Sequence, residues 1–154
     1  MKKNKTWHAV FLPLLFLLFF SCSENSVDIT KPLFAVTTPQ YRSSSEDNRC
    51  KLGGVYFDLY NKADCSIVYL ETRMNVFDRK SGKSAFTGYG TIETSSEVII
   101  KKGETKQMCV PLDDYITIEA EEGYLIDQFY INYIEYEDGR IWKDEFGLYA
   151  AGGK

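Results

Sequence analysis

The sequence predicts an all-β fold in which two sheets pack as an immunoglobulin-like sandwich of about seven strands. Three observations predict it. Residues 50–149 are rich in tyrosine, phenylalanine, isoleucine and valine, which suit the pleated surface of a sheet. Several segments alternate apolar with polar residues, and turn-forming residues separate them at intervals of roughly ten residues. No segment longer than a turn or two shows the 3.6-residue period of a helix.

The first 21 residues have the composition of an export signal. Lys2, Lys3 and Lys5 form a basic head, and Ala9–Phe20 is an unbroken apolar run of twelve residues. A membrane-spanning helix needs about 20 residues. The pattern therefore favours a signal peptide over residues 1–21.

A cysteine follows this apolar run directly. The string Leu18-Phe19-Phe20-Ser21-Cys22 resembles the lipobox of bacterial lipoproteins, in which the cysteine becomes the first mature residue and carries acyl chains. The resemblance implies palmitate-type lipidation of Cys22 and anchorage to a membrane, because two or more chains hold a protein stably. Ser23, rather than Asp, follows the cysteine, and by the same resemblance this favours the outer membrane. An ordinary signal peptide cut nearby is the alternative.

Residues 22–49 are rich in Ser, Thr, Asn and charge, which predicts a flexible tether between the lipid and a folded domain. Leu33–Val36 is an apolar island within it, which could dock as an edge strand or remain part of the linker. The domain is predicted over residues 50–149, and residues 150–154 are predicted to be a C-terminal tail.

Alternating apolar residues predict the core-facing sides of three strands: Val55, Phe57 and Leu59; Val68, Leu70, Met74 and Val76; and Met108, Val110 and Leu112. A hairpin is predicted at Asp138-Gly139, between Phe129–Tyr136 and Arg140–Lys143. Asp-Gly favours a two-residue type I′ turn, which would pair Glu137 with Arg140 and put Tyr133 opposite Asp144.

Three strings resemble the FxLYD-type domains of bacterial surface lipoproteins: Met74–Asp78 (MNVFD), Ile100–Thr105 (IKKGET) and Tyr133–Trp142 (YIEYEDGRIW). Lys102 replaces the proline that is usual in the second string, and Phe57–Asn61 approximates the naming motif one strand earlier. The resemblance covers roughly residues 50–146. It implies an immunoglobulin-like module behind an export signal and a tether, and it brings no catalytic residues.

Charge and composition exclude several function classes. Removal of residues 1–21 takes three lysines from the 18 Lys and Arg, leaving 15 against 22 Asp and Glu, a formal net charge of −7. Such a chain repels phosphate backbones, so we expect no nucleic-acid partner. The only histidine, His8, lies in the signal, which excludes histidine-based catalysis and metal sites in the mature chain. We expect no cofactor.

Three further cysteines, Cys50, Cys65 and Cys109, could oxidise in an exported chain. They allow three single disulfides, and their spacing does not choose among them.

The aromatic residues of the last hairpin are the main candidates for a binding site. A two-residue period puts Phe129 and Tyr133 on one face and Tyr130 and Tyr136 on the other, with Trp142 in the returning strand. Because only one face of a sheet meets the core, we predict that some of Tyr130, Tyr133, Tyr136 and Trp142 are exposed and bind a protein or a glycan. Scattered surface tyrosines, or a covering loop at residues 113–128, are the alternative.

Two acidic features carry less specific hypotheses. Five carboxylates within ten residues could hold Ca²⁺, although a solvated acidic loop is the favoured interpretation: Asp113, Asp114, Glu119, Glu121 and Glu122. Glu135 and Asp144 could form a carboxylate pair for glycoside hydrolysis, although charged surface residues explain them as well.

These features together predict a membrane-anchored, cell-envelope lipoprotein whose sandwich binds other molecules and performs no chemistry. The alternative is a structural or assembly role, in which the domain scaffolds other membrane proteins. A histidine-free carboxylate hydrolase is a more distant hypothesis.

Overall fold

The computed structural model describes residues 31–47, 49–87 and 90–151. The predicted signal peptide, Cys22 and the first part of the predicted tether lie outside the described residues. Within these ranges no helix has the length and the apolar character needed to cross a membrane.

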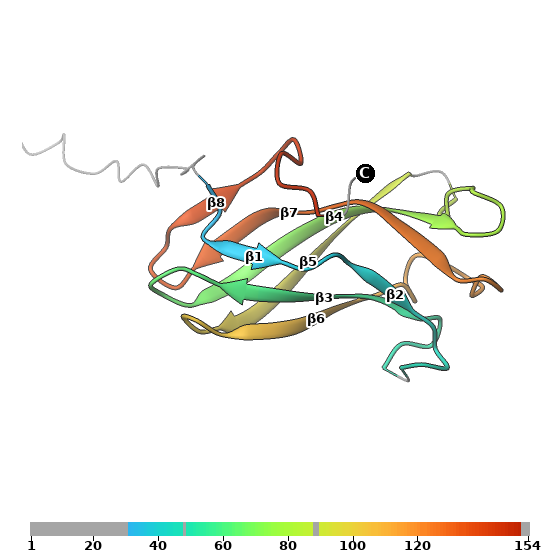
Figure 1. Ribbon diagram of the computed structural model, residues 1–154, viewed down its shortest axis with the longest axis horizontal. Helices are drawn as coiled ribbons and strands as arrows, with labels where there is room; N and C mark the ends of the chain where they lie inside the picture. The colour runs from blue at the N-terminus through green and yellow to red at the C-terminus, as the bar shows by residue number, and fades with distance from the viewer. Residues whose placement is uncertain (1–30, 48, 88–89, 152–154) are drawn as a thin grey trace, which may run out of the picture.

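The first sheet is built around β3 (Gly54–Asn61). Strand β6 (Thr105–Pro111) pairs antiparallel with β3 along one side. On the other side, β1 (Phe34–Val36) pairs with the end of β3 and β2 (Gln40–Arg42) pairs with its beginning. Because β1 and β2 lie end to end along one neighbour, they act as two halves of a single edge strand (Figure 1).

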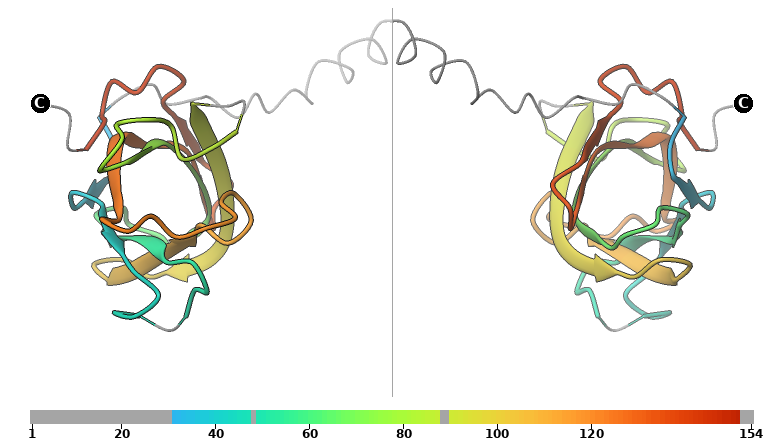
Figure 2. Two further views of the ribbon diagram at one scale, coloured as in Figure 1. Left: turned by 90° about the vertical axis from the view of Figure 1, so that its right-hand side faces the viewer. Right: turned by 90° about the vertical axis from the view of Figure 1, so that its left-hand side faces the viewer.

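The second sheet has the order β5 (Thr91–Ile100), β4 (Ile67–Asp78), β7 (Tyr124–Tyr136) and β8 (Ile141–Lys143), all antiparallel. The chain passes from one sheet to the other between β3 and β4, between β5 and β6, and between β6 and β7. Views along the strands show the two sheets enclosing the interior of the molecule (Figure 2). The predicted all-β sandwich is confirmed, with seven strands in the described residues when β1 and β2 count as one.

The predicted core faces of β3 and β6 are confirmed, since Val55, Phe57, Leu59, Met108, Val110 and Leu112 are all buried. In β4, Leu70, Met74 and Val76 are buried as predicted, but Val68 is only half-buried. The register between β4 and both its neighbours shifts between Ile67 and Tyr69, so Ile67 takes the core position. A β-bulge of this kind inserts one residue and reverses the alternation beyond it.

The predicted hairpin forms, but its predicted turn is wrong by one residue. Gly139 N donates to Tyr136 O at 2.9 Å, and Gly139 has a φ of +83°, while Asp138 has no positive φ. This is a type I turn followed by a left-handed glycine, which makes a longer loop than a type I′ turn. Tyr133 therefore lies opposite Lys143 and not opposite Asp144. The predicted pairing of Glu137 with Arg140 is likewise wrong by one residue, because Tyr136 N donates the hydrogen bond to Arg140 O.

The domain extends beyond residues 50–149 at both ends. The segment assigned to a tether contributes β1 and β2, and Leu33 O accepts a hydrogen bond from Lys62 N at 2.9 Å. At the other end, Ala151 N donates to Phe129 O at 2.7 Å, so the predicted tail begins inside the fold. These short strands provide hydrogen-bond partners for backbone groups at the edges of longer strands. The sequence did not assign them to the domain, because three residues are too few to show the two-residue period of a strand.

Candidate functional site

A second bulge decides which aromatic residues reach the surface. Along β7, Tyr133 lies opposite Glu71 and Ile131 lies opposite Thr72, so Asn132 is the extra residue between two paired positions. The alternation reverses there, which makes the predicted division of the aromatic faces wrong. Of the predicted residues, Tyr136 and Trp142 are both 4% exposed, whereas Tyr130 and Tyr133 are half-buried.

The buried aromatic residues belong to the core. Phe129 packs on Phe57 with ring centroids 4.7 Å apart, and Trp142 meets Phe34 edge to face at 4.8 Å. Among the four predicted binding residues, Tyr133 lines a surface hollow, and Tyr130 lies beneath the backbone of Gly147.

That hollow lies on the outer face of the second sheet and has a volume of about 380 Å³. We call it the Asn132 hollow. Its lining combines carboxylates, cations, an amide and two aromatic rings: Glu71, Arg73, Glu93, Asn132, Tyr133, Lys143, Glu145 and Phe146.

Asn132 is 9% exposed, and its amide orientation is fixed by the two acids beside it. Its Nδ2 donates to Glu71 Oε2 at 3.2 Å and to Glu93 Oε1 at 3.4 Å. Ionised carboxylates only accept hydrogen bonds, so the nitrogen must face them. The Oδ1 atom is buried and accepts no hydrogen bond from the described part of the chain. A ligand that donates a hydrogen bond would satisfy it.

The charges around Asn132 are largely paired. Arg73 Nη2 lies 2.7 Å from Glu93 Oε2, and Tyr69 Oη donates to Glu71 Oε1 at 2.9 Å. That hydrogen bond to Glu71, together with burial, raises the pKa of Tyr69, so the phenol stays a donor at neutral pH. Lys143 Nζ lies 5.4 Å from the centre of the Tyr133 ring.

A structured loop forms the rim of the hollow. Asp144, 4% exposed, accepts hydrogen bonds from the backbone N–H groups of Phe146, Leu148 and Tyr149 at 3.3, 3.0 and 3.0 Å. Gly147 has a φ of +68°, which a glycine adopts without strain. The loop so held leaves Phe146 83% exposed beside the polar lining.

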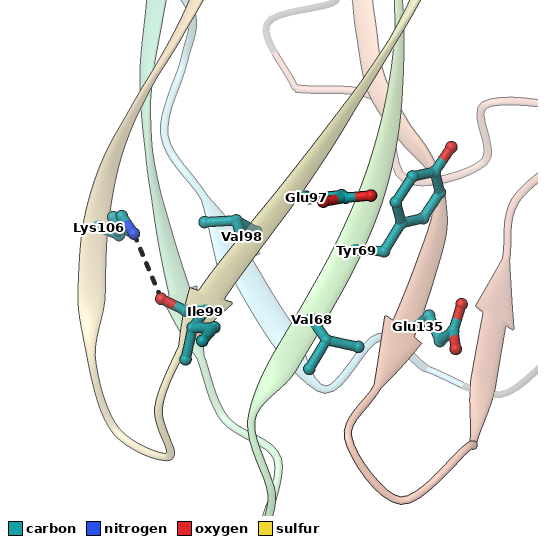
Figure 3. A pocket seen from close by; sticks show the side chains of 7 residues that line it. All are labelled: Val68, Tyr69, Glu97, Val98, Ile99, Lys106 and Glu135. Carbon is teal, nitrogen blue, oxygen red and sulfur yellow. Dashed lines mark hydrogen bonds between the residues drawn. The ribbon is translucent and has the colours of Figure 1, made fainter.

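A broader, shallower hollow of about 780 Å³ lies further along the same face, across β5, β4 and β7 (Figure 3). Figure 3 shows the apolar Val68, Val98 and Ile99 between Lys106 on one side and two glutamates, Glu97 and Glu135, on the other. Lys106 Nζ donates to Ile99 O at 3.3 Å. The Tyr69 and Tyr133 rings, 5.8 Å apart, join the two hollows into one surface.

The five predicted calcium ligands do not converge. Asp113 accepts from Lys51 N and Leu52 N at 3.0 and 2.8 Å, and these backbone bonds lower its pKa. Glu119 accepts hydrogen bonds from Tyr41 of β2 and from Ser44 in the loop after β2. Glu121 pairs with Lys80, and Asp114 and Glu122 are exposed. Asp113, Glu119 and Glu121 each bind different partners. The five carboxylates therefore do not form a shared cation site.

One other group of candidate metal ligands, Asp64, Cys65 and Asp138, has ligand atoms within 4.8 Å of one another in the described residues. The Arg140 guanidinium already lies among them, because it pairs with Asp64 and lies 2.7 Å from Asp138. A second cation there would meet this fixed positive charge.

Glu135 and Asp144, the predicted carboxylate pair, have different surroundings. Glu135 pairs with Ile141 across the hairpin and lines the broader hollow. The Asp144 carboxylate is bound by the three backbone N–H groups described above. The arrangement gives Asp144 a structural role in the rim loop.

Comparison of the chain with protein-family models, with curated proteins and with solved structures gives no match. The assignment of a site therefore depends on the geometry of this chain. Sequence reasoning missed Asn132, Glu71, Glu93 and Phe146. One signal was present, since Asn132 is an amide within the otherwise apolar and aromatic string Tyr130-Ile131-Asn132-Tyr133-Ile134.

Proposed function

We propose that the protein is a lipid-anchored bacterial cell-envelope lipoprotein, of FxLYD type, whose β-sandwich is a binding module without catalytic activity. In this proposal Cys22 carries the lipid and the Asn132 hollow receives the ligand. One observation carries the binding site: Asn132 lines a polar surface hollow, and its buried amide oxygen has no hydrogen-bond partner among the described residues. Buried polar groups are normally hydrogen-bonded, and leaving one unpaired costs about 1–3 kcal/mol.

The lining supports binding in preference to chemistry. The two acids nearest the Asn132 amide are both engaged, Glu93 with Arg73 and Glu71 with Tyr69. A general acid or base must be free to exchange a proton with a substrate at hydrogen-bond distance. These carboxylates instead fix the direction of the amide.

A scaffolding role remains the second candidate, and one observation favours it. The broader hollow presents Ile99, 64% exposed, next to Val68 and Val98, which is an apolar surface suited to a protein partner. Ligand binding that depends on Ile99 and not on Asn132 would favour this role.

The anchor is tested in cells that receive a palmitate analogue. We expect full-length protein to carry the label and to enter the detergent phase on phase separation. Cys22→Ala should lose the label and partition into water, while Cys65→Ala, a matched cysteine variant, should keep both properties. Label that persists in Cys22→Ala would contradict the proposal.

The binding site is tested with the full-length protein in detergent, immobilised on a biosensor and exposed to solubilised cell envelope. Asn132→Leu removes the free acceptor at similar volume and should weaken binding by about tenfold, the equivalent of about 1.4 kcal/mol. Asn75→Leu is the matched control, because Asn75 lies in the same sheet outside both hollows. Equal binding by the two variants would rule out the Asn132 hollow.

A further inference from the structure

We propose that the ligand of the Asn132 hollow is a neutral saccharide, an inference that rests on the binding function proposed above. The first step concerns hydrogen bonds. Asn132 Oδ1 can only accept, and so can the carboxylates of Glu71 and Glu93. The ligand must therefore present several donors within a short distance, as a ring of hydroxyl groups does.

The charges of the lining select against ions. Three acids, Glu71, Glu93 and Glu145, would repel a phosphate or a carboxylate. Arg73 and Lys143 stand among them, Arg73 in an ion pair with Glu93, and would oppose a cationic amine. A neutral polyol avoids both costs, since it brings donors and no charge to desolvate.

The rim supplies an aromatic platform. Phe146 is 83% exposed, although its backbone N–H is bonded to Asp144 and the loop is closed by two further bonds to the same carboxylate. A ring held outward beside a polar lining can cover the C–H face of a sugar while its hydroxyls bond below. The volume of about 380 Å³ equals about thirteen water molecules at ~30 Å³ each, which is room for a hexose ring and its nearest waters.

The test uses full-length protein in detergent and two probes. One probe is a panel of defined neutral oligosaccharides of glucose, mannose, galactose and N-acetylglucosamine. The other is a cell-envelope extract divided into a protease-treated half, in which glycans survive, and a periodate-treated half, in which vicinal diols are cleaved. We expect binding to at least one panel member, and binding to the extract that survives protease and is lost after periodate.

Phe146→Ala should weaken saccharide binding by about fivefold to tenfold through the lost stacking surface. Leu148→Ala is the matched control, because Leu148 is 75% exposed in the same loop and does not line the hollow. If binding survives periodate and is lost to protease, the saccharide inference falls while the binding function stands. If neither half of the extract nor any panel member binds, both fall.

A second inference comes from the cysteines. We infer that Cys50 and Cys109 are joined by a disulfide when the chain meets a disulfide oxidant. Their sulfurs are 3.6 Å apart, and Gly54 makes the approach possible because a Cβ there would lie 3.0 Å from each sulfur. Cys65 lies elsewhere, with its sulfur 3.1 Å from Arg140 Nη2. Of the three pairings that the sequence allows, the structure brings together this one.

The reaction with oxidised glutathione balances as two exchanges. One cysteine thiolate attacks the glutathione disulfide and displaces one glutathione thiolate, and the second cysteine thiolate then displaces the other. The protein loses two thiol protons and two electrons, and the oxidant becomes two molecules of glutathione. Cys109 lies in β6 opposite Tyr56 of β3, and Cys50 lies in the loop before β3, so the bond would fasten this loop to the sheet.

The test incubates reduced full-length protein with oxidised glutathione and maps unreduced peptides by mass. We expect a Cys50–Cys109 peptide in the wild type and in Cys65→Ser, and none in Cys50→Ser or Cys109→Ser. The wild type should also melt on the order of 10 °C higher when oxidised than when reduced. A bridge to Cys65, or glutathione adducts at Cys50 and Cys109 without a bridge, would overturn the inference.

Discussion

At the β-bulge of β7, Asn132 directs its amide nitrogen to two acids, and its buried amide oxygen finds no partner in the part of the chain that the structure describes. An arrangement of this kind contributes little to folding, because the unpaired oxygen costs about as much as the two long hydrogen bonds return. We therefore predict that Asn132→Leu changes the free energy of unfolding by less than about 1 kcal/mol. Urea unfolding followed by the fluorescence of the buried Trp142 measures this change.

Asn61 is the structural counterpart. It is 0% exposed, its Nδ2 donates to Cys65 O and Ile100 O at 2.8 and 2.9 Å, and its Oδ1 accepts from Ala63 N at 2.9 Å. Asn61→Leu should lower the free energy of unfolding by about 3 kcal/mol or more, because three buried backbone groups lose their hydrogen-bond partner. Equal losses in the two leucine variants would show that Asn132 also serves the fold.

Asp144 carries the second residue-scale prediction. Asp144→Ala removes the acceptor of three backbone N–H groups and should cost about 2–3 kcal/mol. Hydrogen exchange at Phe146, Leu148 and Tyr149 should accelerate, while thermal melting reports the global loss. Glu145→Ala is the control, because that side chain is exposed and should change stability by less than about 0.5 kcal/mol. Unchanged exchange in Asp144→Ala would show that the loop is held by other contacts.

At the scale of elements, Gly54 at the start of β3 leaves room for the sulfurs of Cys50 and of Cys109 in β6. A Cβ at Gly54 would lie 3.0 Å from both Cys50 Sγ and Cys109 Sγ and 3.2 Å from Val110 O. Gly54→Ala should therefore cost about 1–3 kcal/mol in reduced protein. Cys109→Ala in the same chain should recover part of this loss, giving a coupling energy measurable by a double-mutant cycle. Gly90→Ala, with open space around the glycine, is the control. Strictly additive costs would contradict the contact.

The sheet elements also show how far the sequence could predict the fold. The alternation of Leu70, Met74 and Val76 reflects a face that is buried along the strand, and it identified the core correctly. The bulges at Val68 and Asn132 depend on how three neighbouring strands share a register, which is a tertiary property. One bulge was enough to exchange the predicted faces of Tyr133 and Tyr136.

The same reasoning explains what was missed at the candidate site. The sequence located an aromatic hairpin, and Tyr133 does line the Asn132 hollow. Apart from Asn132, the remaining lining comes from β4, β5, β8 and the rim loop, segments between about 10 and 60 residues away in the chain. Nothing local marks Glu71 or Glu93 as neighbours of Asn132, because their proximity follows from strand order alone.

At the scale of the whole molecule, one end of the sandwich is closed by contacts between distant loops. Tyr41 of β2 meets Tyr124 of β7 edge to face at 5.1 Å, across the two sheets. Tyr41 Oη also donates to Glu119 Oε1 at 2.5 Å, and Ser44 donates to the same carboxylate through N and Oγ at 3.0 and 2.6 Å. In the same two loops, the Asp113 carboxylate accepts hydrogen bonds from the backbone N–H groups of Lys51 and Leu52. Ionised carboxylates thus join the β2–β3 loop to the loop that follows β6.

These bonds make stability depend on pH in a direction that can be worked out. Burial opposes ionisation of Glu119, but the hydrogen bonds from Ser44 and Tyr41 prevail and its pKa lies below the ordinary value of 4.5. The pKa of Asp113 lies below the ordinary 3.8 because of its two backbone donors. Four more aspartates are lowered by hydrogen bonds: Asp47, Asp64, Asp78 and Asp138. In acid the unfolded chain binds more protons than the folded chain, so acid favours unfolding.

We therefore predict that the melting temperature is constant above about pH 5 and falls as the pH drops through 4 towards 2, where the folded-state carboxyls take up protons. Glu119→Gln cannot ionise, so it should lower the melting temperature at pH 6 and flatten the decline between pH 5 and 3. Glu122→Gln is the control, because Glu122 is exposed. If the wild type and Glu119→Gln decline in parallel, the Ser44–Glu119–Tyr41 contacts do not hold this end of the sandwich together. If the melting temperature of Glu122→Gln falls in parallel with that of the wild type while that of Glu119→Gln falls less steeply, the acid sensitivity arises from the contacts between the two loops.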